Sequence, residues 1–316
     1  MNAVLSPTPE SGRTARYAQV VRLSKKSEWQ IDRDVMRDRN FDFSRKFLPD
    51  GLSRVDALSF LTDSDARLLS QVQGRTYAYI FGLVERFISA KMLDQGRAHA
   101  LDDQHALEAL VRFTGDEIKH QELFRRMEVM IGEQMPAGYR QMANPSDVAR
   151  AVLAASTWAV LALTCHIELF VQSHYAESIS KTADLCPLFK DVFLYHWKDE
   201  SQHVVLDELE WKDEHERLSP AQHDVAVDDL IALVAAVDGI LQAQSAADVE
   251  YFVRSASRPF SEEEVGDIKS VVLGAYRWQY IISGVRHPHF GRLLNSMTTP
   301  AQMLRIQQAL APILGA

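Results

Sequence analysis

Two short segments of the sequence place a glutamate and a histidine three residues apart. They are EIKH, with Glu117 and His120, and ESQH, with Glu200 and His203. Residues i and i+3 lie on the same face of a helix, so each segment presents a carboxylate and an imidazole to one point. Carboxylate and imidazole together suit iron or manganese. The two segments therefore indicate a metal site, although one such segment alone means little.

Two further glutamates strengthen this interpretation through their spacing. Glu85 precedes Glu117 by 32 residues, and Glu168 precedes Glu200 by the same 32 residues. On an antiparallel neighbouring helix, a residue about 32 positions earlier can present its carboxylate at the same level. Four carboxylates buried without cations would be prohibitively costly. We therefore predict a centre for two metal ions with the ligands Glu85, Glu117, His120, Glu168, Glu200 and His203.

Three more residues lie close to these ligands in the sequence HWKDESQH and in DEIKH. His196 precedes Glu200 by one helical turn and falls on the same stripe, so it is a candidate third nitrogen ligand. The alternative for His196 is core packing with a satisfied imidazole. Asp116 and Asp199 each precede a ligand glutamate, and we predict that they accept the outer N–H of the histidines. The alternative for both aspartates is a solvated helix face.

Composition limits the classes of protein to which the chain can belong. It has 316 residues, 47% of them hydrophobic, and a net charge of -9, which fits a globular protein with a large core and argues against nucleic acid or an anionic membrane as partner. Cys165 and Cys186 are too far apart for a CxxC site, and the first residues do not resemble a signal peptide. We expect a cytoplasmic location and no membrane span.

The hydrophobic pattern predicts an all-α fold without hairpin signals. We expect a flexible tail over residues 1–15 and a single domain over 16–316, with the metal-binding bundle at about 64–218 and extra helices over 220–316. RHPHFG, residues 286–291, is predicted as a loop or helix start. Capping residues, glycines and prolines place the helices at 64–96, 102–135, about 145–178, 187–218, 220–244, 246–256, 261–284 and 300–313.

At these ligand residues the chain resembles the ferritin-like di-iron carboxylate superfamily, whose pattern is E…ExxH…E…ExxH. The segment HWKDESQH is similar to the His-x-x-x-Glu-x-x-His segment of the p-aminobenzoate N-oxygenase type. The resemblance covers about residues 70–215. It implies a ferritin-like four-helix bundle and an O2-dependent oxygenase that acts on a small organic substrate, with an amine as the first candidate.

The resemblance also implies roles for the ligands. Glu85 and Glu168 would be terminal ligands, Glu117 and Glu200 would bridge, and His196 would be a seventh ligand. Two iron ions are expected, with manganese or a mixed Mn/Fe pair as alternatives. Electrons would come from an external donor such as a ferredoxin or a reductase, because the sequence has no flavin, nicotinamide or iron–sulfur signature. A homodimer is expected.

Two other classes of function stay open at this stage. An R2-like oxidase or a ferroxidase could use the same ligands, the latter to oxidise Fe(II) without an organic substrate. A helical protein that binds metal without catalysis is the second alternative. Fold alone does not choose among them, because one fold hosts many chemistries.

Overall fold

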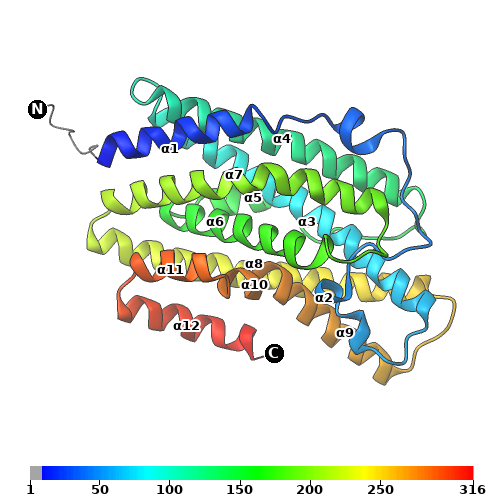
Figure 1. The fold of residues 1–316 in the computed structure, drawn as a ribbon. Helices are drawn as coiled ribbons and strands as arrows, with labels where there is room; N and C mark the ends of the chain where they lie inside the picture. The colour runs from blue at the N-terminus through cyan, green and yellow to red at the C-terminus, as the bar shows by residue number, and fades with distance from the viewer. Residues whose placement is uncertain (1–8, 316) are drawn as a thin grey trace, which may run out of the picture.

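The computed structural model describes residues 9–315, and this range contains helices and no strand (Figure 1). The expected all-α class is therefore confirmed. The shorter elements are α2 (Asp50–Ser53), α10 (Ser283–Val285), the 3₁₀ turn η2 (Val55–Ala57) and the π-helical turns η1 (Ile31–Met36), η3 (His174–Ile179) and η4 (Trp278–Ile282). The longer helices are α1 (Pro9–Ser24), α3 (Asp63–Ala98), α4 (Gln104–Gly132), α5 (Pro145–Leu153), α6 (Thr157–Ser173), α7 (Pro187–Arg217), α8 (Pro220–Ser255), α9 (Glu262–Arg277), α11 (Pro288–Ser296) and α12 (Pro300–Leu314).

Four of these helices form the bundle that matters for function. α3 packs along α4, and α6 packs along α7. Local chemistry sets where the helices begin. Thr62 and Asp65 form a reciprocal capping box at the start of α3, and Pro187 occupies the first turn of α7, where its missing N–H costs nothing. The predicted first, second and fourth long helices thus agree with α3, α4 and α7 to within three residues.

The third predicted helix, about 145–178, is wrong as a single element. The chain leaves the helical conformation at residues 154–156, so α5 and α6 are separate, and η3 follows α6. The backbone N–H of Ser156 donates instead to Asp229 of α8, at 2.8 Å. A hydrogen bond to another helix therefore replaces one within the helix. The hydrophobic periodicity of the sequence continues through this position and does not indicate the break.

The predicted tail over residues 1–15 is also wrong for its last part, whereas residues 1–8 lie outside the described residues. Residues 9–15 belong to α1, which lies along α4 and α7 (Figure 1). Arg13 pairs with Glu216 of α7 at 3.2 Å, and Thr14 donates to Asp103 at 2.6 Å. Tyr17 is almost fully buried. These long-range contacts order a segment whose composition alone suggests disorder.

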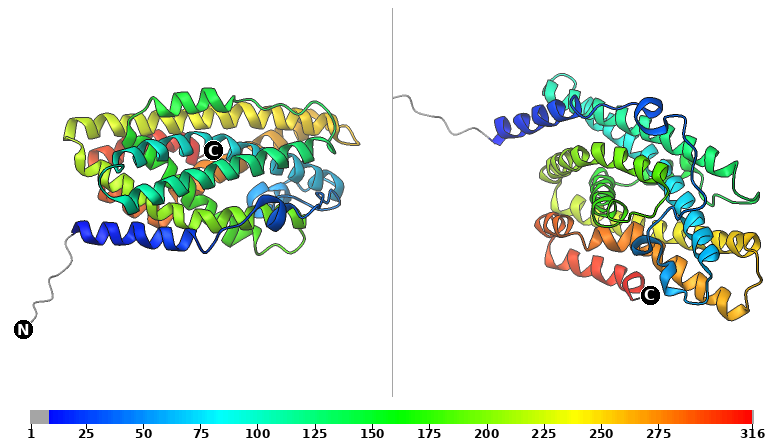
Figure 2. Two further views of the ribbon diagram at one scale, coloured as in Figure 1. Left: turned by 90° about the horizontal axis from the view of Figure 1, so that it is seen from above. Right: turned by 45° about the vertical axis from the view of Figure 1, so that its right-hand side comes forward.

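The C-terminal helices cover the opposite side of the bundle from α1, as Figures 1 and 2 show. We predicted two helices, 220–244 and 246–256, but these residues form the single helix α8. At the expected break Gln244 and Ser245 are buried, and the Gln244 side chain donates to the carbonyl of Arg140 at 3.0 Å. RHPHFG starts α11, which confirms the expected loop or helix start. In the described part of the chain, we find no helix with the length and apolarity needed to span a bilayer.

A buried carboxyl group joins three of these helices away from the bundle centre. Asp248 of α8 accepts hydrogen bonds from Thr76 of α3 at 2.6 Å, from Tyr276 of α9 and from Gln244 at 2.8 Å. Burial raises the pKa of Asp248 to about 7, although these hydrogen bonds oppose the rise. The native state therefore binds a proton at this residue that the unfolded chain releases near pH 4.

We predict that this proton makes stability depend on pH. The folded-state pKa of Asp248 lies above the unfolded value, so its contribution is complete below about pH 4 and is lost as pH rises through 7, by at most about 4 kcal/mol. Asp248→Asn should flatten the decline in unfolding free energy between pH 5 and pH 8, measured by urea titration. Equal declines in both proteins would contradict the prediction.

Candidate metal centre

The structure brings all seven predicted ligand residues together at the centre of the bundle. One group combines Glu85 of α3, His120 of α4, and His196 and Glu200 of α7, and a second combines Glu117, Glu168, Glu200 and His203. Within each group, one ligand atom from every residue lies within 4.8 Å of the others, and all of these residues are buried. Glu200 belongs to both groups. The geometry thus provides two adjacent positions that share a carboxylate.

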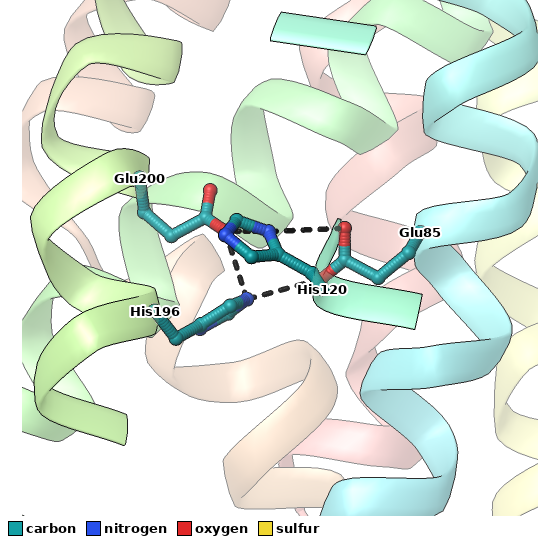
Figure 3. Close-up of side chains that lie close together, drawn as sticks. All are labelled: Glu85, His120, His196 and Glu200. Atoms are coloured by element: carbon teal, nitrogen blue, oxygen red, sulfur yellow. Dashed lines mark hydrogen bonds and ion pairs between the residues drawn. The ribbon is translucent and has the colours of Figure 1, made fainter. Parts of the chain in front are cut away.

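His196 lies inside the first group rather than in the surrounding core. Its Nε2 is 3.0 Å from Oε1 of Glu85 and 2.8 Å from Oε1 of Glu200. Figure 3 shows His196 and Glu200 on one helix, facing Glu85 across the bundle with the His120 ring between them. Nδ1 of His120 is 3.1 Å from Oε1 of Glu200. This position therefore offers two imidazole nitrogens and two carboxylates.

The second group is richer in oxygen. Nδ1 of His203 lies 2.9 Å from Oε1 of Glu117 and 2.9 Å from Oε2 of Glu200. Glu168 enters from α6, two residues beyond His166, which points to the other side of that helix. Glu117 also lies 3.9 Å from Nδ1 of His120. Glu200 therefore faces both positions, whereas Glu117 belongs to the second group and lies near the first only through His120; bridging stays a prediction for both glutamates.

The outer nitrogens of two histidines meet the predicted aspartates. Nε2 of His120 contacts Oδ2 of Asp199 at 3.2 Å, and Nε2 of His203 lies 3.6 Å from Oδ2 of Asp116. The Lys119 ammonium bridges the pair, at 2.9 Å from Asp116 and 2.8 Å from Asp199. Each aspartate comes from the helix opposite its histidine. Asp199 is therefore buried and contacts an imidazole of the cluster, whereas Asp116 lies beside His203 without a hydrogen bond to it and is partly exposed, so that an orienting role stays a prediction for both.

Trp29 is a further residue of the site, and sequence analysis missed it. Its indole Nε1–H donates to Oδ2 of Asp199 at 2.8 Å, and its ring lies under the Lys119 ammonium, 4.1 Å from the centroid. Trp29 lies between α1 and η1, in a segment without helical periodicity, so no sequence signal points to it. Lys119 had a weak signal, since it directly precedes His120 within EIKH.

Aromatic rings enclose the side of the centre that His196 occupies. The His196 ring makes edge contacts with Phe81 and Phe124, at centroid distances of 5.3 Å and 5.0 Å, and Phe193 lies 6.2 Å away. All three phenylalanines are buried. Such rings exclude water and lower the local dielectric constant, which strengthens electrostatic interactions inside the site.

Mutual neutralisation controls the charges of the cluster. Burial raises the pKa of Glu168 well above its usual range, and the nearby Glu200 charge adds to the rise. Burial also opposes ionisation of Glu200, yet His196 and His203 outweigh it and hold the pKa of Glu200 well below its usual range. For His203, burial opposes protonation, but Glu200 and Asp116 raise its pKa to about 10. Protons on the histidines thus balance the carboxylates, and bound cations would displace them.

The donor set fits two divalent metal ions. Several atoms that face the centre have no hydrogen-bond partner among residues 9–315, namely Oε2 of Glu85, both oxygens of Glu117, Nδ1 of His120, Oε2 of Glu168 and Oε1 of Glu200. Buried polar atoms of native proteins are nearly always paired, so unpaired ones call for an explanation such as an ion. Carboxylates and imidazoles on facing bundle helices are the ligands of di-iron and di-manganese proteins.

Comparison with known proteins agrees with this geometry. A family model described as "P-aminobenzoate N-oxygenase AurF" matches residues 28–257, which include all seven cluster residues, Asp116, Asp199 and Trp29. The chain belongs to the AurF family. The chain is therefore an oxidoreductase.

Similar solved structures are mutants of R2-like ligand-binding oxidases. One with a Mn/Fe cofactor is 15% identical over 83% of this chain and 92% of that chain, with a TM-score of 0.45. Another with a Mn/Mn cofactor is 16% identical over 88% of this chain and 93% of that chain, with a TM-score of 0.43. No curated protein matches the sequence.

The contact between Trp29 and Asp199 leads to a prediction about metal affinity. In Trp29→Phe, Asp199 loses a hydrogen bond and orients His120 less firmly. Loss of a residue that contacts a metal ligand directly typically costs about 10- to 100-fold in affinity; Trp29 acts through Asp199, which Lys119 also holds, so we expect a measurable but smaller loss for one metal per chain. Competition with a metal-responsive chelator would measure it.

Trp278→Phe is a matched control, because Trp278 lies in η4 and contacts Arg54 and Arg286 instead of the cluster. Equal metal affinity of Trp29→Phe and the unaltered protein would remove the positioning role from Trp29.

Proposed function

We propose that the protein is an O2-dependent di-metal oxygenase that oxidises the nitrogen of a small aromatic amine. The observation that carries the proposal is the third imidazole, His196, placed against Glu85 and Glu200 in a chain of the AurF family. A single oxygenation balances as R–NH2 + O2 + two electrons + two protons, giving R–NHOH and H2O. Two iron ions would supply the O2 chemistry, with manganese or a Mn/Fe pair as alternatives.

The chain's own residues would hold and enclose this chemistry. Glu85, His120 and His196 would ligate one metal, Glu168 and His203 the other, and Glu117 and Glu200 would lie between them. The rings of Phe81, Phe124 and Phe193 would give an aryl substrate an apolar surface and keep bulk water out. This enclosure supports chemistry that is shielded from bulk water.

Several features of this function rest on the sequence alone. The two electrons would come from an external ferredoxin or reductase. A homodimer and a cytoplasmic location also stay predictions. Reduction assays with purified donors would test the electron donor, and analytical ultracentrifugation would test the homodimer.

Metal content is the first test of the proposed ligands. After anaerobic loading with Fe(II), we expect about two iron ions per chain, as in other carboxylate-bridged bundle proteins. Glu117→Ala should lower this number, because it removes a carboxylate from between the positions. Elemental analysis on the desalted protein measures both. A metal-free protein under these conditions would contradict the proposed oxygenase and also every alternative that needs a bound metal.

Product analysis tests the reaction itself. Reduced, iron-loaded protein is mixed with p-aminobenzoate and ¹⁸O2, and mass spectrometry follows label in the hydroxylamine and in later oxidation products. We expect label on nitrogen, and His196→Ala should lower its yield by at least about tenfold while retaining part of the iron. The control His105→Ala replaces an exposed histidine of α4 and should behave like the unaltered protein.

The same experiment separates the alternatives. Consumption of O2 without labelled product, together with Fe(II) oxidation that His196→Ala leaves unchanged, would contradict the proposal and favour a ferroxidase. Label on carbon rather than nitrogen would keep the oxygenase but overturn N-oxygenation.

A further inference from the structure

Tyr77 of α3 lies behind the phenylalanine rings that enclose His196. Its ring centroid is 4.6 Å from that of Phe81 and 5.0 Å from that of Phe193, and these two rings lie next to the His196 ring, at 5.3 Å and 6.2 Å. Tyr77 is 1% exposed. Burial raises the pKa of its hydroxyl well above the usual range, so the phenol keeps its proton. One layer of aromatic rings therefore separates a buried phenol from the metal centre.

A hydrogen-bond chain leads from the Tyr77 hydroxyl toward the surface. The hydroxyl lies 2.8 Å from Nδ1 of His174, and Nε2 of His174 lies 2.9 Å from Oγ of Ser283, which is partly exposed. Ser283 donates its own hydrogen to the carbonyl oxygen of Gln279 at 3.1 Å, so its oxygen accepts the N–H at Nε2 of His174. Burial lowers the pKa of His174 to about 3, and the ring is neutral. Nδ1 of His174 is therefore an acceptor, and Tyr77 donates to it.

Two π-helical turns position this hydrogen-bond chain. His174 is the first residue of η3, and Ser283 directly follows η4. A π turn closes its hydrogen bonds over five residues instead of four, so the side chains beside it face another side than a continuous α-helix would give them. Such turns are frequent at functional sites. Here the turns bring residues from two distant segments to the hydroxyl of Tyr77.

The contacts on the two sides of Tyr77 suit different transfers. Phe81 and Phe193 carry no group that binds or releases a proton, so only an electron can cross them toward His196. On the other side, His174 offers an acceptor nitrogen to which the phenol can pass its proton. A phenol that has lost an electron is a strong acid, and it loses the electron more readily when a hydrogen-bonded base takes the proton. The geometry therefore suits coupled loss of an electron and a proton.

We propose that Tyr77 is a redox-active residue, which gives one electron to the oxidised metal centre when no substrate is bound and passes its proton to His174. The O–H bond of Tyr77 breaks and an N–H bond forms at Nδ1 of His174. The products are a neutral tyrosyl radical, an imidazolium and a metal centre that has gained one electron. The external donor of the proposed oxygenase then returns one electron to the radical, and the proton moves back to oxygen.

This inference rests on the proposed function, because O2 must first oxidise the metal centre. The electron from Tyr77 spares the rings around His196 from oxidation in cycles without substrate. Tyr77 is not a metal ligand, since it precedes Glu85 by eight residues on α3, about 12 Å along the helix axis. Its role is therefore measured by the radical and not by the number of bound metal ions.

Electron paramagnetic resonance on the full chain tests the inference. Protein loaded with Fe(II) is mixed with O2 in the absence of substrate and frozen at increasing times. We expect a radical signal that narrows when the protein contains ring-deuterated tyrosine. Tyr77→Phe should lose this signal, and His174→Phe should lose it as well, because the phenol then has no acceptor nitrogen.

Tyr280→Phe is the matched control. Tyr280 is buried, and its ring centroid lies 6.0 Å from that of Tyr77. Its hydroxyl has no hydrogen-bond partner in the described part of the chain, so it cannot pass on a proton. This variant should keep the radical signal of the unaltered protein.

Two further measurements use other properties of the protein. In the metal-free protein, ¹⁵N NMR of labelled histidine should show His174 neutral with its hydrogen on Nε2, and Tyr77→Phe should shift its Nδ1 signal while Tyr280→Phe should not. After repeated exposure of the iron-loaded protein to O2 without substrate, peptide mass spectrometry should find more oxygen added to Phe81, Phe193 and His196 in Tyr77→Phe than in Tyr280→Phe.

The outcomes separate this inference from the proposed function. Iron that O2 oxidises without a tyrosyl signal in the unaltered protein would overturn the inference and leave the oxygenase standing, whereas iron that stays reduced in O2 would overturn both. A tyrosyl signal that persists in Tyr77→Phe would place the radical on another tyrosine and overturn the inference. A hydrogen on Nδ1 of His174 would remove the proton acceptor and do the same, and equal oxidation of Tyr77→Phe and Tyr280→Phe would overturn the protective role.

Discussion

The burial of four glutamates in one bundle core is the constraint on which the rest of the structure depends. Carboxylates that cannot reach water must be neutralised. In the cluster, His120, His196 and His203 each place a ring nitrogen within 3.1 Å of a glutamate oxygen. Long helices follow from this need, since only α3, α4, α6 and α7 packed side by side bring such groups to one level. Two bound metal ions would best balance the negative charge of these glutamates.

Charged residues outside the cluster surround its histidines. Lys119 contacts both Asp116 and Asp199. Asp116 lies beside His203 of the second group, and Asp199 contacts His120 of the first. Trp29 holds Asp199 from outside the bundle. The site is therefore built from α3, α4, α6, α7 and the irregular segment before η1. That segment contributes the hydrogen bond from Trp29 to Asp199.

The sequence could predict the bundle part of the site because its signals are local or periodic. The i,i+3 spacing of Glu117 and His120 places both on one helical face, and the offset of 32 residues aligns neighbouring helices. Trp29, the break at residues 154–156 and the order of residues 9–15 follow from long-range partners, namely Asp199, Asp229 and α7. Such partners leave no periodic trace, and they override local composition.

The position of three cluster residues on one helix has a consequence for how this chain can vary in length. His196, Glu200 and His203 share one face of α7 only because their separations are near whole helical turns. An insertion or deletion of a single residue between His196 and His203 would rotate part of the set by about 100° and shift it by about 1.5 Å. This stretch therefore cannot change in length, whereas the α7–α8 junction at Leu218 and Ser219 lies beyond the ligands and is free of that restriction.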